Sequence, residues 1–137
     1  MMKKILSTGY SDTAFNFAIL LLRLVFGITI CLHYGVSKIT SFSEYVHNFF
    51  DPFGIGHRWS LVLAIIAEVF GSMLLVLGLF TRIAALVLVF EMCVIIFMYK
   101  HSQPFNYHEN AVLFLIGFAV ILLVGPGRIS VDAMAGK

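Results

Sequence analysis

Four long apolar stretches make up most of this chain and decide what it can fold into. They cover roughly residues 14–34, 60–80, 83–100 and 109–124. Each approaches the roughly 20 residues that a helix needs to cross a hydrocarbon core of about 30 Å, and the last stretch is the shortest. Open strands would leave backbone groups unpaired in lipid, so only helices suit these segments. The sequence therefore predicts an all-α membrane protein with a four-helix transmembrane bundle.

The composition agrees with lipid as the solvent of this chain. Its 137 residues are 61% hydrophobic and 12% charged, whereas soluble domains carry about 25% charged residues. We expect one domain over residues 1–137. The net charge of +2, with no basic run longer than Lys3-Lys4, gives no reason to expect a nucleic acid partner. Arg23 interrupts the first apolar stretch and no small-x-small cleavage site follows it, so we expect a retained span.

The distribution of Lys and Arg between the loops predicts the orientation. Connecting the four stretches places five of these residues on one side and three on the other. The richer side is expected to be cytoplasmic, so both termini should lie inside a multi-pass protein of the cell (inner) membrane. The first side holds Lys3, Lys4, Arg82, Arg128 and Lys137, and the second holds Lys38, Arg58 and Lys100.

The first outer loop has a helical pattern of its own. Ser41 and Glu44 have the spacing of a capping box, and Pro52 would stop the helix. We expect a short amphipathic helix that anchors to the membrane surface or folds over the mouth of the bundle. Its apolar positions are Phe42, Tyr45, Val46, Phe49, Phe50 and Phe53.

Three ionisable residues, Arg23, Glu68 and Glu91, lie in the middle of different apolar stretches. At a rise of about 1.5 Å per residue all three come near the bilayer midplane. We expect Arg23 to pair with one or both carboxylates, because its planar fork binds a carboxylate through two hydrogen bonds. Such a group either fixes helix register or forms a ligand or proton site, and these three residues are the catalytic candidates.

A second polar group is expected at the outer mouth. His33 and Lys38 end the first stretch near Glu109 and Asn110, which begin the fourth, and the four would serve as caps or as ligands. The five histidines have no metal-binding spacing, and no haem, flavin or metal signature is present. Cys31 and Cys93 are expected at different depths, so no disulfide is predicted.

Several motifs resemble those of the DoxX family, in the family order and over nearly the whole chain. Ser72 stands where a second glycine is common in the family. The matching residues are Arg23-Leu24, Gly27 and His33-x-Gly35-x-x-Lys38, then Glu68-x-x-Gly71 and Leu77-Gly78-Leu79-x-Thr81-Arg82-x-Ala84-Ala85, and finally Gly125-Pro126-Gly127-Arg128-x-Ser130-x-Asp132. The resemblance implies a four-helix membrane protein. Family members are described as oxidoreductases after a subunit linked to thiosulfate oxidation with quinone as acceptor, others are associated with thiol or oxidative-stress defence, and distant animal relatives are assembly factors.

Three hypotheses of function follow. In the first, the chain is a quinone-linked redox subunit or accessory protein of a partner protein. Arg23, or His33 and Lys38, would then bind quinone carbonyls, and Glu68 and Glu91 would accept protons. In the second, it is a non-catalytic scaffold or assembly factor that docks a protein partner. The third is a small proton-coupled transporter, for which four spans would require a homo-oligomer.

Overall fold

The computed structural model describes residues 6–47, 51, 53–99 and 109–136, and within these residues it contains helices and no strands. The expectation of an all-α protein is confirmed for this part of the chain. Some residues used in the predictions above lie outside the described ranges. They are Lys3, Lys4, Phe49, Phe50, Pro52, Lys100 and Lys137.

In the described ranges the helices form four long segments and two short ones. The first segment is a continuous rod of α2, the π-helical η1 and α3, and the short α4 follows it. The third long segment is α6 continued by the π-helical η2. The bounds are α2 (Asp12–Thr29), η1 (Ile30–Gly35), α3 (Val36–Thr40), α4 (Phe42–Tyr45), α5 (His57–Leu77), α6 (Thr81–Val94), η2 (Ile95–Tyr99), α7 (Glu109–Val124) and α8 (Val131–Met134).

The turn between α5 and α6 is built around Gly78. This residue has φ +73°, a left-handed conformation that glycine adopts without steric cost. The N–H of Leu79 donates to the Leu74 carbonyl at 2.9 Å and the N–H of Gly78 donates to the Leu75 carbonyl at 3.1 Å, which closes the end of α5. α6 therefore starts at Thr81 and runs antiparallel to α5.

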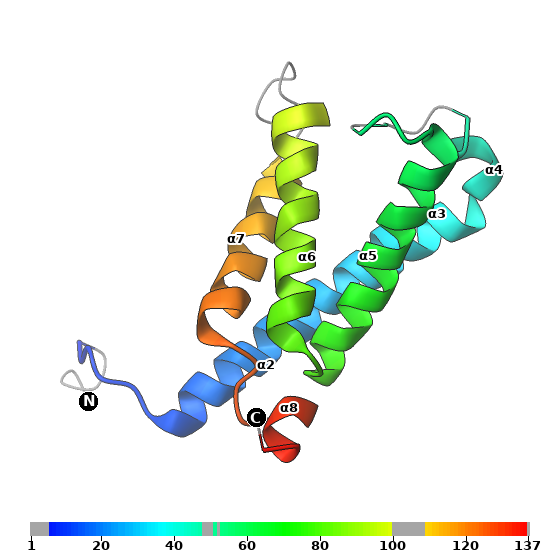
Figure 1. Ribbon diagram of the computed structural model, residues 1–137. Coiled ribbons are helices and arrows are strands. Elements are labelled where there is room, and N and C mark those ends of the chain that lie inside the picture. The colour runs from blue at the N-terminus through cyan, green and yellow to red at the C-terminus, as the bar shows by residue number, and fades with distance from the viewer. Residues whose placement is uncertain (1–5, 48–50, 52, 100–108, 137) are drawn as a thin grey trace.

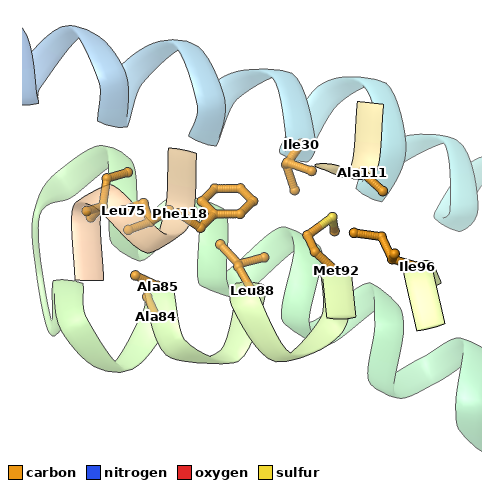
Figure 2. Packing of buried hydrophobic residues seen from close by; sticks show 10 residues of the cluster. Ile30, Leu75, Ala84, Ala85, Leu88, Met92, Ile96, Ala111 and Phe118 are labelled. Atoms are coloured by element: carbon orange, nitrogen blue, oxygen red, sulfur yellow. The ribbon is translucent and has the colours of Figure 1, made fainter. Parts of the chain in front are cut away.

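α6 packs against both α5 and α7, while α2 contacts α5 and α7. In Figure 1, α6 and α7 stand side by side and the long α2–α3 rod crosses behind them, with α5 following the rod. We call the end with the α5–α6 turn and α8 the basal end, and the end with α3, α4 and the start of α5 the distal end. Figure 2 shows the apolar interior between these helices, where Phe118 lies among Ile30, Leu75 and Leu88.

The outward faces of the helices are apolar. Asp12–Thr40 and His57–Leu77 are long and apolar enough to cross a membrane, and α7 is a shorter apolar helix. Only 22% and 33% of the most apolar windows of the two long segments are buried within the protein. A core helix of a soluble protein would bury most of that window, so this surface is typical of helices that face lipid.

The helix expected in the first outer loop is present only in part. α4 is a single turn that ends at Tyr45. The expected capping box is wrong, because Ser41 makes no side-chain cap and instead closes α3 through its own N–H. Ser41 lacks the extended backbone of an N-cap because α3 runs almost directly into α4. Phe53 lies beyond the helix and stacks on Phe90 of α6 with ring centroids 6.2 Å apart.

Candidate functional site

Arg23 is held in a cage of main-chain carbonyls. Only 1% of the residue is exposed. Its Nε donates to the Leu75 carbonyl at 2.9 Å and its Nη2 donates to the Val76 carbonyl at 3.1 Å, both at the end of α5. Its Nη1 donates to the carbonyls of Pro126 and Ile129 at 2.8 and 2.7 Å. Arg23 therefore joins α2 to the end of α5 and to the segment that follows α7.

The expected pairing of Arg23 with Glu68 and Glu91 is wrong. The Cα–Cβ bonds of a helix tilt toward its N-terminus, so the side chain of Arg23 extends toward the basal end of α2. There the guanidinium donates to the Val76 carbonyl and adds a second donor to the Leu75 carbonyl, which also accepts from the N–H of Gly78. Among acidic groups, the carboxylate of Asp132 is the one that interacts with Arg23 electrostatically.

Asp132 completes this basal arrangement. Its Oδ1 accepts from the N–H of Phe80 at 2.9 Å and its Oδ2 accepts from the N–H of Thr81 at 3.0 Å. Both N–H groups lie at the N-terminal end of α6, where a carboxylate is also favoured by the helix dipole. The N–H of Asp132 donates to the Gly78 carbonyl at 2.9 Å. Figure 1 shows α8 directly below the turn between α5 and α6. Asp132 was not among the predicted site residues, although it belongs to the last of the motifs quoted above.

Lys38 and Glu68 form the ion pair of a second polar site. The Nζ of Lys38 on α3 lies 3.0 Å from Oε1 and 2.9 Å from Oε2 of Glu68 on α5. The Lys38 side chain is 15% exposed and that of Glu68 is 3% exposed. An ion pair so shielded from solvent is costly to separate, because either charge alone would remain in apolar surroundings.

Glu91 on α6 extends this site to a third helix. Its carboxyl group interacts with that of Glu68. Two carboxyl groups that meet in buried surroundings favour a proton on one of them, because two negative charges there would repel each other. Oε2 of Glu91 is buried and has no hydrogen-bond partner within the described part of the chain. We call Lys38, Glu68 and Glu91 the triad. It combines one cation, a carboxyl pair that holds a proton, and one unsatisfied oxygen.

The triad lies between helices at mid-height of the bundle. Glu91 is ten residues into α6, or about 15 Å from its basal end. The sequence therefore identified Glu68 and Glu91 as neighbours, while their cation is Lys38 rather than Arg23.

The outer cluster expected from His33, Lys38, Glu109 and Asn110 does not assemble. Lys38 points to Glu68 instead. His33 is exposed, with its ring 5.0 Å from that of Tyr34. Glu109 and Asn110 are exposed at the start of α7. A charged amine at this depth is stabilised far more by a buried carboxylate than by exposed polar groups.

Tyr34 is a neighbour of the triad that the sequence reasoning missed. The Nζ of Lys38 lies 5.7 Å from the centroid of the Tyr34 ring, which is within the range of a cation–π interaction. The same ring lies edge-on to Phe114 of α7, with centroids 5.7 Å apart. The i, i+4 spacing of Tyr34 and Lys38 is the sequence signal that was available.

The helical fold of the described residues and its apolar exterior indicate a helical membrane protein. A family model described as DoxX matches residues 18–101, more than half of the chain. The chain belongs to the DoxX family. Neither the comparison with curated proteins nor the comparison with solved structures gives a match.

Proposed function

We propose that this chain is a four-span membrane protein whose triad is a proton-exchange site serving a quinone-linked redox reaction, with a partner protein as electron donor or acceptor. The proposed spans are the α2–α3 rod, α5, α6–η2 and α7. Both ends of the described chain lie at the basal end, which also holds Arg82 and Arg128. Together with the sequence count of five Lys and Arg residues against three, this supports a cytoplasmic basal end, because cytoplasmic loops of membrane proteins carry an excess of Lys and Arg.

The single observation that carries the proposal is the buried group of two interacting carboxyls, Glu68 and Glu91, beside the ammonium of Lys38. Ionisable groups at this depth are expensive and typically mark proton pathways or binding sites. Lys38 offsets one negative charge, so the pair exchanges a single proton while the triad alternates between neutral and singly negative. The unsatisfied Oε2 of Glu91 is the atom at which a proton would arrive or leave.

A bound quinone would supply reversible two-electron, two-proton chemistry. The residues of this chain would contribute by holding a proton on the carboxyl pair and by keeping water away from it. Glu68 is fixed by Lys38, so Glu91 is the group free to pass a proton on. The partner would exchange the electrons with the quinone. The family resemblance supports the quinone and the partner, and the triad supports the proton.

Infrared difference spectroscopy tests the proton site directly. The full chain in lipid nanodiscs is taken through a pH step, and the C=O stretch of protonated carboxyl groups is recorded. We expect a band that disappears in Glu91→Gln and remains in Glu44→Gln, which removes an exposed carboxylate of α4. A spectrum that is the same in wild type and Glu91→Gln would remove the proton site and the proposal with it.

Native mass spectrometry of the protein extracted with its own lipids tests the quinone. A retained quinone supports the redox role. No quinone and a defined protein partner would instead assign the chain to scaffolds or assembly factors. The closed environment of Arg23 favours that second function, because its hydrogen bonds to four carbonyls leave little capacity for a ligand carbonyl.

A further inference from the structure

A groove lies on the bundle surface between α2 and α7. Its volume is about 240 Å³, which is below the roughly 300–1,000 Å³ of pockets that enclose drug-sized ligands. It has room for one ring system and stays open on its outer side. Its lining residues are Val25, Phe26, Thr29, Asn110, Leu113 and Phe114.

Two aromatic rings give this groove a specific shape. Phe26 and Phe114 lie edge-to-face, with centroids 5.5 Å apart and an interplanar angle of 74°. A flat ring entering the corner between them stacks on one and meets the edge of the other, and both arrangements are favourable for aromatic rings. An acyl chain gains nothing from this geometry beyond ordinary apolar contact.

Asn110 adds a polar group to an otherwise apolar lining. Its side chain is exposed and makes no hydrogen bond with any residue that the structure describes. An exposed amide at the rim of an apolar groove can donate to a carbonyl group of a ligand or accept from its hydroxyl group. The nearby Thr29 hydroxyl donates to the Val25 carbonyl at 2.6 Å and keeps its lone pairs free as acceptors.

The groove is connected to the triad through Tyr34. The Tyr34 ring meets Phe114, a lining residue, edge-on with the two ring centroids 5.7 Å apart. The Nζ of Lys38 also lies 5.7 Å from the centroid of the Tyr34 ring. A ring held against Phe114 is thus separated from Lys38 by two aromatic rings, those of Phe114 and Tyr34.

We infer that the α2–α7 groove binds the head group of a lipid-soluble ring that carries a hydrogen-bond acceptor, a quinone or quinol, with Asn110 as its donor. This inference rests on the proposed function and names the ligand site for it. The ring lies against Phe26 and Phe114, its tail continues into the bilayer, and the rings of Phe114 and Tyr34 separate it from the triad.

The test uses decylubiquinone and the full chain in nanodiscs of synthetic phosphatidylcholine, with the signal of protein-free nanodiscs subtracted. Leu113→Trp fills the groove, and Ile116→Trp is its matched control on the outward face of the same helix. Both positions are more than half exposed, so neither change disturbs the core. We expect saturable binding to wild type and Ile116→Trp, loss of saturation in Leu113→Trp, and binding about fivefold weaker in Asn110→Leu.

The outcomes separate this inference from the proposed function. Saturable binding that Leu113→Trp leaves unchanged overturns the groove as the site but not the quinone link. Absence of saturable binding to wild type overturns both the quinone link and the groove, and means that the groove holds only ordinary lipid chains. A Leu113→Trp protein that has lost quinone binding but keeps the Glu91 infrared band supports a ligand site distinct from the proton site.

Discussion

The guanidinium of Arg23 ends among carbonyls from two segments that are distant in sequence. Its planar fork suits several carbonyls in one plane, whereas a lysine ammonium is a point charge with a different donor geometry. The charge itself is offset by the dipole at the end of α5 and by Asp132 rather than by a directly bonded carboxylate.

Arg23→Met is expected to destabilise the fold by on the order of 3 kcal/mol or more, because each buried acceptor left without a donor costs about 1–3 kcal/mol. Arg128→Met is the control, since Arg128 is exposed and surface changes usually stay within about 0.5 kcal/mol. Denaturant or thermal unfolding in detergent measures both. Equal effects of the two substitutions would contradict the structural role of Arg23.

Two glycines of the bundle interior differ sharply in the space around them. A Cβ at Gly117 would overlap the Phe26 ring, whereas a Cβ at Gly71 would lie at an ordinary 3.5 Å from Leu88. Gly117→Ala should therefore destabilise the protein by about 1–3 kcal/mol through overpacking. Gly71→Ala should be neutral or stabilising, by up to about 1 kcal/mol of helix propensity. Thermal unfolding of the two variants measures this difference, and similar changes in Tm would refute the close α2–α7 contact.

At the scale of elements, the start of α5 depends on the carboxylate of Asp51. Oδ1 accepts from the Ile55 N–H at 3.1 Å and from the Ser60 hydroxyl at 2.9 Å, and Oδ2 accepts from the Gly56 N–H at 2.8 Å. Partial desolvation raises the pKa of Asp51, but these hydrogen bonds and the charge of His57 outweigh it, so the pKa lies below its usual range.

The Asp51 contribution to stability should depend on pH. The carboxyl pKa in the folded protein is below that of the unfolded chain, which is about 3.9. The ionised group thus stabilises the fold fully above that pH, and the stabilisation is lost as the pH falls through the lower folded pKa. The Tm difference between wild type and Asp51→Asn should be present at pH 7 and disappear in strong acid. A Tm difference independent of pH would contradict this role of the ionised Asp51 carboxylate. Glu44→Gln, which removes an exposed carboxylate, is the control.

The π-helical η1 changes which residues of the first helix share a face. A π-turn holds one more residue than an α-turn, so every side chain after it is rotated relative to a continuous α-helix. Lys38 follows η1 directly in α3 and reaches Glu68. Its partner was therefore beyond a prediction made with a period of 3.6 residues.

At the scale of the whole molecule, two polar sites are separated along the bundle by apolar packing. The basal site is built on Arg23 and Asp132, and the triad lies at mid-height.

Lys38→Met should destabilise the fold by about 3–5 kcal/mol, because it leaves a buried carboxylate without its cation. The double variant Lys38→Met/Glu68→Gln should recover most of that loss. A double-mutant cycle of unfolding free energies measures this, and additive effects would show that the pair is uncoupled.

Much of the helical architecture could be predicted from the sequence, and most partners within it could not. The apolar stretches identify the long helices, and Gly78 and Gly125 lie where α5 and α7 end. Glu68 and Glu91 meet as their depths predict. The partner of Arg23 depends on the direction in which its side chain leaves the helix, and the role of Tyr34 depends on how η1 and α7 pack together. Neither can be obtained from residue spacing.

The hydrogen bonds of Arg23 also have a consequence for biosynthesis. Two of the carbonyls that accept from Arg23, those of Pro126 and Ile129, are synthesised 103 and 106 residues after Arg23. At roughly 5–20 residues per second, the ribosome needs about 5–20 s to reach them. During that interval a nascent first helix in the bilayer would hold a guanidinium without its full set of acceptors, so a translocase, a chaperone or local water has to shelter it until the basal segment arrives.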